Sequence, residues 1–230
     1  MVSCGQANNA PPLDPCFVGH LCTQVQGEPT DKEREMEGLG LIDVSTLDPG
    51  IKVQMVYATP YNFMGRVLYE GLNRAYLQPD VAQKLLKAYK ALKQLRPDLT
   101  FVVYDAARPI GIQQEMWNMV KGTAWNYYVI NPAKGGGMHN FGAAVDLSLM
   151  DCTGKSLEMG SSYDYFGEEA NTDKEEELVR KGLITPRELK NRLLLRKVMC
   201  EAGFRTVKSE WWHFNACSLD EAKQQYKIIE

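Results

Sequence analysis

The amino-acid sequence predicts an α+β domain with a central antiparallel sheet that is flanked by helices. Segments with apolar residues at helical spacing lie before and between strand-like segments, and several predicted strands follow one another along the chain. Consecutive strands favour antiparallel pairing, whereas a doubly wound sheet needs a helix after each strand. The 230 residues are enough for one domain with a sizeable core, and 44% hydrophobic residues is ordinary for a globular protein.

The chain begins with a segment that is not expected to join this domain. Residues 1–38 are rich in Pro, Gly, Asn and charge, which predicts a tether or a poorly ordered N-terminal arm. Residues 39–230 are expected to form the single folded domain. Its first predicted strand is residues 41–44. Apolar and polar side chains alternate over residues 51–57, which predicts a second strand or an extended edge.

The middle of the chain carries two helix signals and one strong strand signal. Apolar residues at helical spacing predict a helix over residues 79–95, and Pro97 follows its end. The β-branched and aromatic residues of segment 99–104 predict a strand. Pro109 suits the start of a second helix, predicted over residues 110–120.

The C-terminal half completes the predicted sheet. Residues 145–149 are expected to be a central strand, and the charged run at 168–181 a solvated helical face or loop with no site. Thr185 and Glu188 have the spacing of a capping box, so a helix should begin there, and Gly203 is placed to end it. The remaining predictions are paired strands at 204–207 and 210–214 and a short helix at 219–226.

Composition and charge limit the partners and the compartment. The net charge of −3 without a basic stripe predicts no nucleic-acid partner, and no apolar run approaches the ~20 residues of a transmembrane span. Cys4, preceded by a small residue and followed by a polar stretch, resembles a bacterial lipoprotein N-terminus after signal-peptide removal. This indicates a lipid anchor at Cys4 and a periplasmic or cell-envelope location; a cytoplasmic protein with an incidental cysteine is the alternative. Cys16 and Cys22 are close enough to form a small disulfide loop.

The few histidines point to a metal site. The chain has three, and His139 precedes Asp146 by seven residues, with His213 in a second aromatic-rich cluster. Two imidazoles and one carboxylate suit a catalytic zinc ion, because three protein ligands leave the fourth position open. The alternative is two unrelated core strands whose polar residues are satisfied by hydrogen bonds.

Two further residues are candidates for catalysis. Glu210 stands three residues before His213, where it can act as general base, although Glu-x-x-His also occurs as a simple surface pair. Arg108 follows the predicted strand at 99–104 and is a candidate to stabilise an oxyanion. Its alternative role is a structural salt bridge with Asp105.

These segments carry a family resemblance. Residues 137–146 resemble the Ser-x-His-x-x-Gly-x-Ala-x-Asp signature of zinc D-alanyl-D-alanine peptidases, and residues 210–213 resemble their Glu-x-Trp-His signature. Blocks around Tyr57, Arg108 and Asp164 resemble those of vancomycin-resistance type D-Ala-D-Ala dipeptidases, in the same order. The resemblance extends from about residue 40 to residue 217.

The resemblance implies a fold, a cofactor and a reaction. The fold would be that of the zinc D-Ala-D-Ala peptidases and hedgehog-type domains. One Zn²⁺ per chain, held by His139, Asp146 and His213, would activate water to split the D-Ala-D-Ala dipeptide into two D-alanines. Asp164 would bind the substrate ammonium, and Tyr57 would line the same end of the pocket.

The sequence departs from the family pattern at two places in the first signature. Gly137 stands in place of the signature serine, and Asn140-Phe141 replaces a Ser-Arg pair. The family serine is implicated in holding substrate, so that contact is absent or replaced. Two alternatives stay open: a D,D- or L,D-carboxypeptidase that trims peptidoglycan stem peptides, and a non-catalytic binding module that keeps the zinc site.

Overall fold

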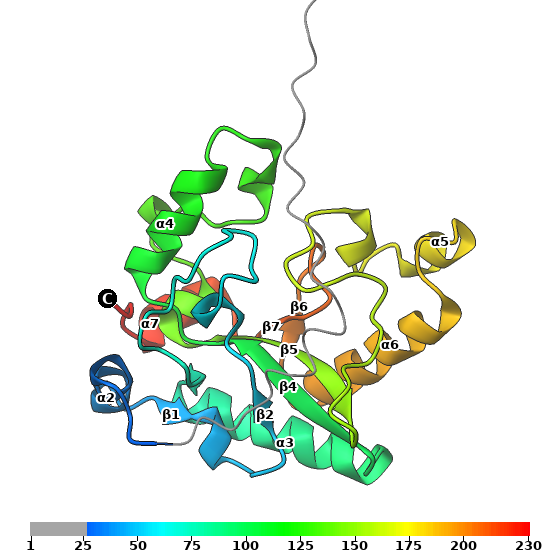
Figure 1. The fold of residues 1–230 in the computed structure, drawn as a ribbon, viewed down its shortest axis with the longest axis horizontal. Helices are drawn as coiled ribbons and strands as arrows, with labels where there is room; N and C mark the ends of the chain where they lie inside the picture. The colour runs from blue at the N-terminus through cyan, green and yellow to red at the C-terminus, as the bar shows by residue number, and fades with distance from the viewer. Residues whose placement is uncertain (1–26) are drawn as a thin grey trace, which may run out of the picture.

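The computed structural model describes residues 27–230, which form a mixed sheet with helices around it (Figure 1). The sheet has the order β2-β4-β5-β7-β6, from Lys52–Val53 (β2), Leu99–Asp105 (β4), Ala144–Asp151 (β5), His213–Asn215 (β7) and Arg205–Thr206 (β6). Three of the four pairings are antiparallel, and β2 pairs with β4 in parallel. The predicted α+β class is confirmed, with one parallel pair at the sheet edge.

The first two predicted strands are placed differently from expectation. The first, Ile42–Asp43 (β1), pairs with Tyr76–Leu77 (β3) in a separate two-stranded sheet. The second is short, because the 3-10 turn Val56–Ala58 (η2) follows β2. In this turn the carbonyl of Tyr57 accepts hydrogen bonds from the N–H groups of residues 68 and 69. These non-local bonds, rather than the alternating pattern, decide the course of the chain here.

Two long helices cover one face of the sheet. Helix α3 (Pro79–Leu95) packs on β4, α6 (Pro186–Glu201) packs on β5 and β6, and the two helices contact each other. The bounds of α3 agree with the prediction. At the start of α6 the predicted capping box is present, because Thr185 Oγ1 accepts a hydrogen bond from the N–H of Glu188 at 3.2 Å.

The charged run contains more buried structure than the sequence suggests. It includes the turn Glu168–Ala170 (η6) and helix α5 (Glu175–Arg180). Glu175 is buried and lies 2.7 Å from Nη2 of Arg196 on α6. The expectation of a wholly solvated face is therefore wrong at this residue, because a partner 21 positions away neutralises it.

Part of the predicted N-terminal arm is folded. Residues Asp31–Gly38 form helix α2, whose capping box joins Thr30 and Glu33. The Glu33 carboxylate is 1% exposed and accepts hydrogen bonds from the N–H groups of Asn73 and Arg74. Met36 is buried as well. Helix α2 therefore lies before the predicted boundary at residue 38, while the predictions at Cys4, Cys16 and Cys22 lie outside the described residues.

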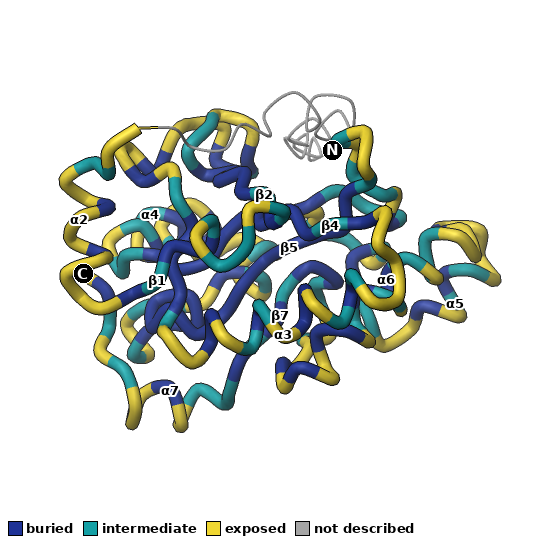
Figure 2. Tube along the Cα trace, turned by 90° about the horizontal axis from the view of Figure 1, so that it is seen from below, coloured by how far each residue is buried: buried dark blue, intermediate teal, exposed yellow. Residues whose placement is uncertain are grey.

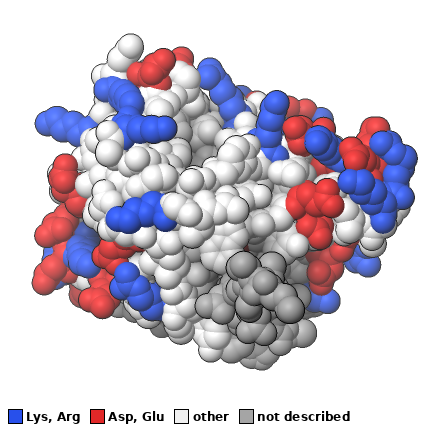
Figure 3. All heavy atoms as spheres, turned by 90° about the horizontal axis from the view of Figure 1, so that it is seen from above, with Lys and Arg blue, Asp and Glu red and all other residues white. Residues whose placement is uncertain are grey.

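The core lies around the two central strands. Strands β4 and β5 are buried almost throughout, and the exposed positions collect on peripheral elements such as α2, α5 and α7 (Leu219–Gln225) (Figure 2). The face in Figure 3 shows acidic and basic side chains mixed around a mainly uncharged centre. Within residues 27–230, no helix is both long and apolar enough to cross a bilayer.

Candidate active site

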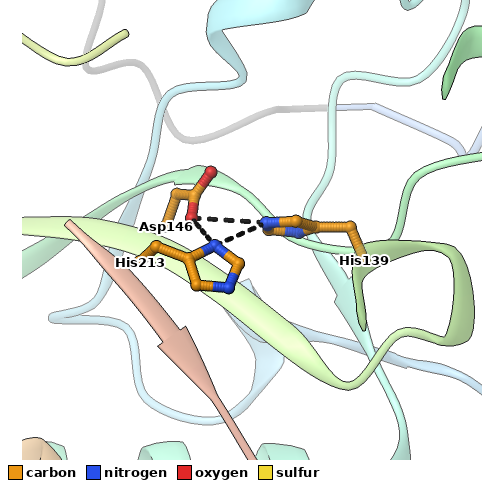
Figure 4. A group of neighbouring side chains, drawn as sticks. All are labelled: His139, Asp146 and His213. Carbon is orange, nitrogen blue, oxygen red and sulfur yellow. Dashed lines mark hydrogen bonds and ion pairs between the residues drawn. The ribbon is translucent and has the colours of Figure 1, made fainter. Parts of the chain in front are cut away.

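Neighbouring parts of the sheet bring the predicted metal ligands together. Asp146 on β5 and His213 on β7 are direct partners across the antiparallel pair, so their side chains meet on one face. His139 lies in the 3-10 turn Met138–Phe141 (η5), which leads into β5. Figure 4 shows its ring pointing at the other two side chains.

The three ligand atoms form a small triangle. Nδ1 of His213 lies 2.9 Å and Nε2 of His139 lies 3.3 Å from the same oxygen, Oδ1 of Asp146. The two imidazole nitrogens are 3.1 Å apart. Tetrahedral zinc with bonds of about 2.0–2.1 Å separates its ligand atoms by about 3.3 Å. The triangle therefore has nearly the size that zinc requires.

The outer hydrogen bonds fix which imidazole nitrogens are free to bind a metal. Nδ1 of His139 lies 2.6 Å from the carbonyl oxygen of Ala106, which can only accept, so this nitrogen carries the proton. Nε2 of His213 likewise faces Oδ1 of Asn215 at 2.8 Å. With His213 deprotonated at Nδ1, two nitrogen lone pairs and a carboxylate oxygen converge on one point. This set of donors fits zinc.

The pKa values of Asp146 and His213 are shifted in opposite directions by their interaction with each other. Burial alone would raise the pKa of Asp146, but the charge and hydrogen bonds of His139 and His213 hold it well below its usual range. Burial alone would also lower the pKa of His213. The hydrogen bond and charge of Asp146 outweigh burial and raise the pKa of His213 to about 9. A bound metal would replace the proton that this pair otherwise retains.

Tyr163 forms a hydrogen bond to the Asp146 carboxylate through the oxygen that does not face the two histidines. Its hydroxyl donates to Oδ2 of Asp146 at 3.0 Å and is buried. We expect Tyr163→Phe to weaken zinc affinity ~10–100-fold, the usual effect of removing an outer partner of a metal ligand. Competition against a chelator measures this affinity. Tyr165→Phe is the control, because that ring is 37% exposed; unchanged zinc affinity in Tyr163→Phe would contradict the assignment.

Glu210 lies beside the metal ligands without joining the triangle. It occupies the turn before β7, since the predicted strand at 210–214 begins only at His213. Its Oε2 is 3.8 Å from Nδ1 of His213, and its side chain is 18% exposed. Burial and the charge of Asp146 raise the pKa of Glu210, although the charge of His213 opposes them. A carboxyl group with a raised pKa is suited to proton transfer near neutral pH.

Arg108 is held by several partners and still faces the site. Its Nε donates to Oδ2 of Asp105 at 3.1 Å, and its Nη1 donates to Oε1 of Gln113 at 2.8 Å. The salt bridge that the sequence left as an alternative therefore exists. The backbone N–H of Arg108 also donates to the carbonyl of His139 at 3.0 Å. The guanidinium is thus fixed relative to the metal ligands.

Tyr57 and Asp164 meet across the cleft from distant parts of the chain. The Tyr57 hydroxyl donates to Oδ1 of Asp164 at 2.9 Å. Oδ2 of Asp164 is buried and has no hydrogen-bond partner among the described residues. Burial raises the pKa of Asp164, and the Tyr57 hydrogen bond only partly offsets this effect. The backbone of Asp164 has φ of 58°, a conformation that ordinarily favours glycine.

One cleft of about 190 Å³ collects these residues. It is lined by all seven of the predicted site residues: Tyr57, Arg108, His139, Asp146, Asp164, Glu210 and His213. Pockets for drug-sized ligands begin at about 300 Å³, so this cleft suits a smaller molecule. Gly137 also lines it, and a Cβ there would lie 2.9 Å from Cδ1 of Ile130. The Ile130 side chain therefore covers the position of the signature serine.

Sequence reasoning missed three side chains that support the site. Asn215 could have been found, because it lies two residues after His213 on the same strand face. Gln113 shares the buried stripe of α4 (Ile110–Val120) with Met116, so a polar residue on an apolar face was the signal. Nothing local in the sequence indicates the hydrogen bond of Tyr163 to Asp146.

The chain is similar to known dipeptidases along most of its length. Residues 37–228 match the sequence profile described as D-ala-D-ala dipeptidase. The D-alanyl-D-alanine dipeptidase of Escherichia coli is 32% identical over 174 residues, covering 76% of this chain and 83% of that protein. The enzyme of the same name from Enterococcus faecium is 27% identical over 199 residues, covering 76% and 91%.

A solved structure shows a much weaker likeness. The vancomycin-resistance D,D-pentapeptidase VanY, in complex with Zn(II), aligns at 14% identity with a TM-score of 0.35, covering 68% of this chain and 80% of that one. Nothing about the site rests on that alignment. The profile match and the Escherichia coli relative are sufficient: the chain belongs to the D-Ala-D-Ala dipeptidase family.

Proposed function

We propose that this protein hydrolyses the D-Ala-D-Ala dipeptide to two D-alanines, with one Zn²⁺ per chain and residues 39–230 as its catalytic domain. The observation that carries the proposal is the single small cleft lined by the metal triangle, Glu210, Arg108 and Asp164. The names of the Escherichia coli and Enterococcus relatives agree with this substrate.

The metal and the carboxylate of Glu210 divide the chemistry. Zinc, when bound by His139, Asp146 and His213, supplies a Lewis acid that polarises the peptide carbonyl and makes water acidic. Glu210, beside His213, accepts a proton from the attacking water and passes it to the leaving amine. Arg108 lies preorganised at the cleft wall, where its positive charge stabilises the developing oxyanion.

Asp164 supplies recognition of the free amino end. Among residues 27–230 its Oδ2 is buried without a hydrogen-bond partner, and burial raises its pKa, so these residues place no positive charge on this oxygen. A substrate ammonium provides that charge and a hydrogen-bond donor together. Tyr57 orients the carboxylate through Oδ1 and leaves Oδ2 for the ligand.

Acetylation of the amino end tests this assignment. D-Ala-D-Ala should be preferred over N-acetyl-D-Ala-D-Ala by at least ~30-fold in kcat/KM, the factor for the ~2 kcal/mol lower bound of a buried charge pair. Asp164→Asn keeps the size of the side chain and should reduce this preference while zinc content stays unchanged. Zinc analysis and D-alanine release measure the two effects.

The same comparison separates the alternative functions. Equal hydrolysis of the free and acetylated peptides would contradict the dipeptidase assignment and favour a carboxypeptidase, for which a stem pentapeptide is the diagnostic substrate. Zinc-loaded protein with no turnover of any of these peptides would favour a binding module. The presence of Glu210 and Arg108 argues against such a module, because a structural zinc site needs neither and is normally closed by a fourth ligand.

The location of the protein is also a proposal. A lipid anchor at Cys4 would place the enzyme in the periplasm or cell envelope, whereas a protein without the anchor would be cytoplasmic. Labelling cells with a fatty-acid analogue and comparing the intact chain with Cys4→Ala tests this. Label on the variant would exclude Cys4 as the attachment site.

A further inference from the structure

We infer that Gln113 is a positioning residue that couples the roof loop, defined as residues 121–137, to the guanidinium of Arg108. The part of this inference that concerns catalysis rests on the proposed dipeptidase function. The part that concerns the loop itself does not, because it follows from the hydrogen bonds of the protein alone.

The Gln113 side chain forms hydrogen bonds to both the guanidinium of Arg108 and the backbone carbonyl of Ile130. Its Oε1 accepts from Nη1 of Arg108 at 2.8 Å, and its Nε2 donates to the carbonyl of Ile130 at 2.9 Å. A guanidinium can only donate and a carbonyl can only accept, so the orientation of the amide is unambiguous. Gln113 is 3% exposed and its bond to Arg108 is buried, so water does not readily replace that bond, while the bond to Ile130 is part-buried.

The middle of the roof loop, residues 124–136, has few other hydrogen bonds to the rest of the described residues. It carries Gly122 near one end and Gly135 and Gly136 near the other, all with positive φ. Between residues 27 and 230, two hydrogen bonds join segment 124–136 to residues outside the loop. One comes from Gln113 and the other from the Lys223 ammonium to the Lys134 carbonyl, which is exposed. The bond from Gln113 is part-buried, whereas the bond from Lys223 is exposed.

Aromatic side chains of the roof loop also pack against Phe166, but these contacts do not involve the loop backbone. The Tyr128 ring stacks on Phe166 at 4.8 Å between centroids, and Trp125 contacts the same ring at 5.8 Å. Stacked rings tolerate sliding, whereas a hydrogen bond to one carbonyl sets a position. At Ile130 the hydrogen bond from Gln113 acts together with the packing of the buried neighbour Val129 to position the backbone.

The position of Ile130 matters because this part of the loop forms a wall of the cleft. The wall comprises four consecutive residues: Tyr127, Tyr128, Val129 and Ile130. The Ile130 side chain also covers Gly137, two residues before the metal ligand His139. A displacement of the loop at Ile130 would withdraw the acceptor of Gln113 and so loosen the amide that holds Arg108. The position of the loop therefore affects the one guanidinium nitrogen that Gln113 holds, while Asp105 holds the other two.

Two substitutions at Gln113 separate the two halves of the bridge. Gln113→Leu has similar size and removes both bonds. Gln113→Glu keeps an acceptor for Arg108 but cannot donate to Ile130. The matched control is Gln114→Leu on the same helix, because Gln114 is exposed and bonds only to Asn118 among the described residues.

Hydrogen exchange of the intact protein, measured without substrate, tests the loop attachment. Amides of residues 127–131 should exchange about tenfold faster in both Gln113 variants and at the wild-type rate in Gln114→Leu. Wild-type exchange in Gln113→Leu would overturn the attachment. Equal acceleration in Gln114→Leu would overturn it too, because the cause would then be a general loosening of α4.

Kinetics on zinc-loaded protein test the coupling. We expect Gln113→Leu to lower kcat ~10–100-fold through a misplaced Arg108, and Gln113→Glu to raise KM with kcat within about threefold of wild type. Faster loop exchange with unchanged kcat and KM in both variants would overturn the coupling. If wild-type protein did not cleave D-Ala-D-Ala, the proposed function would fail, while the exchange experiment would still decide the loop attachment.

Discussion

Glu210→Gln is expected to keep the fold and the bound zinc but to lower kcat on D-Ala-D-Ala by ~10²–10⁴-fold, the usual contribution of a positioned acid–base group. The amide has nearly the size of the carboxyl group, and Glu210 lies outside the ligand triangle, with 3.8 Å between Oε2 and Nδ1 of His213. The loss should therefore appear in kcat, because the substitution removes proton transfer rather than binding.

The control separates proton transfer from a general loss of negative charge. Glu176→Gln makes the same substitution at an exposed position of α5 and should leave kcat and zinc content unchanged. Zinc analysis, thermal unfolding and D-alanine release are measured on both variants. Turnover within tenfold of wild type in zinc-loaded Glu210→Gln would move the role of base to another group in the cleft.

The parts of the fold that the sequence predicts well are those determined by local signals. Helices at Pro79–Leu95 and Ile110–Val120 have the predicted bounds, because helical periodicity and flanking prolines act within a few residues. The capping box at Thr185 is local in the same way. The group of His139, Asp146 and His213 was predictable for another reason, since two of the three histidines of the chain and one aspartate lie in two short clusters.

The parts that the sequence misplaces depend on contacts between distant segments. The charge of Glu33 suggests a solvated arm, but N–H groups 40 and 41 positions away bind its carboxylate. Residues 51–57 alternate like a strand, yet hydrogen bonds to residues 68 and 69 end the strand early. The bonds of Tyr163 and Gln113 likewise join separate elements. No pattern within a single segment can indicate such partners.

His139→Ala is expected to abolish specific zinc binding and, with it, peptide hydrolysis. Two ligands, Asp146 and His213, would remain, and a zinc site needs at least three protein ligands for catalysis. Zinc that binds only the folded state raises the unfolding temperature by mass action. The thermal shift on zinc addition should therefore be present in wild-type protein and absent in His139→Ala, independently of any activity assay.

The protonation of His213 provides a second signature of the same site. Because the pKa of His213 is raised to about 9 in the metal-free group, the proton is bound below that pH and must leave when zinc binds. Zinc affinity should thus weaken as the pH falls below about 9, and calorimetry in two buffers of different ionisation enthalpy should detect proton release in wild-type protein. His20→Ala substitutes the remaining histidine of the chain and is the matched control, expected to keep both signals. Full zinc content and proton release in His139→Ala would show that His139 is not a zinc ligand, and another residue would then have to supply the third donor.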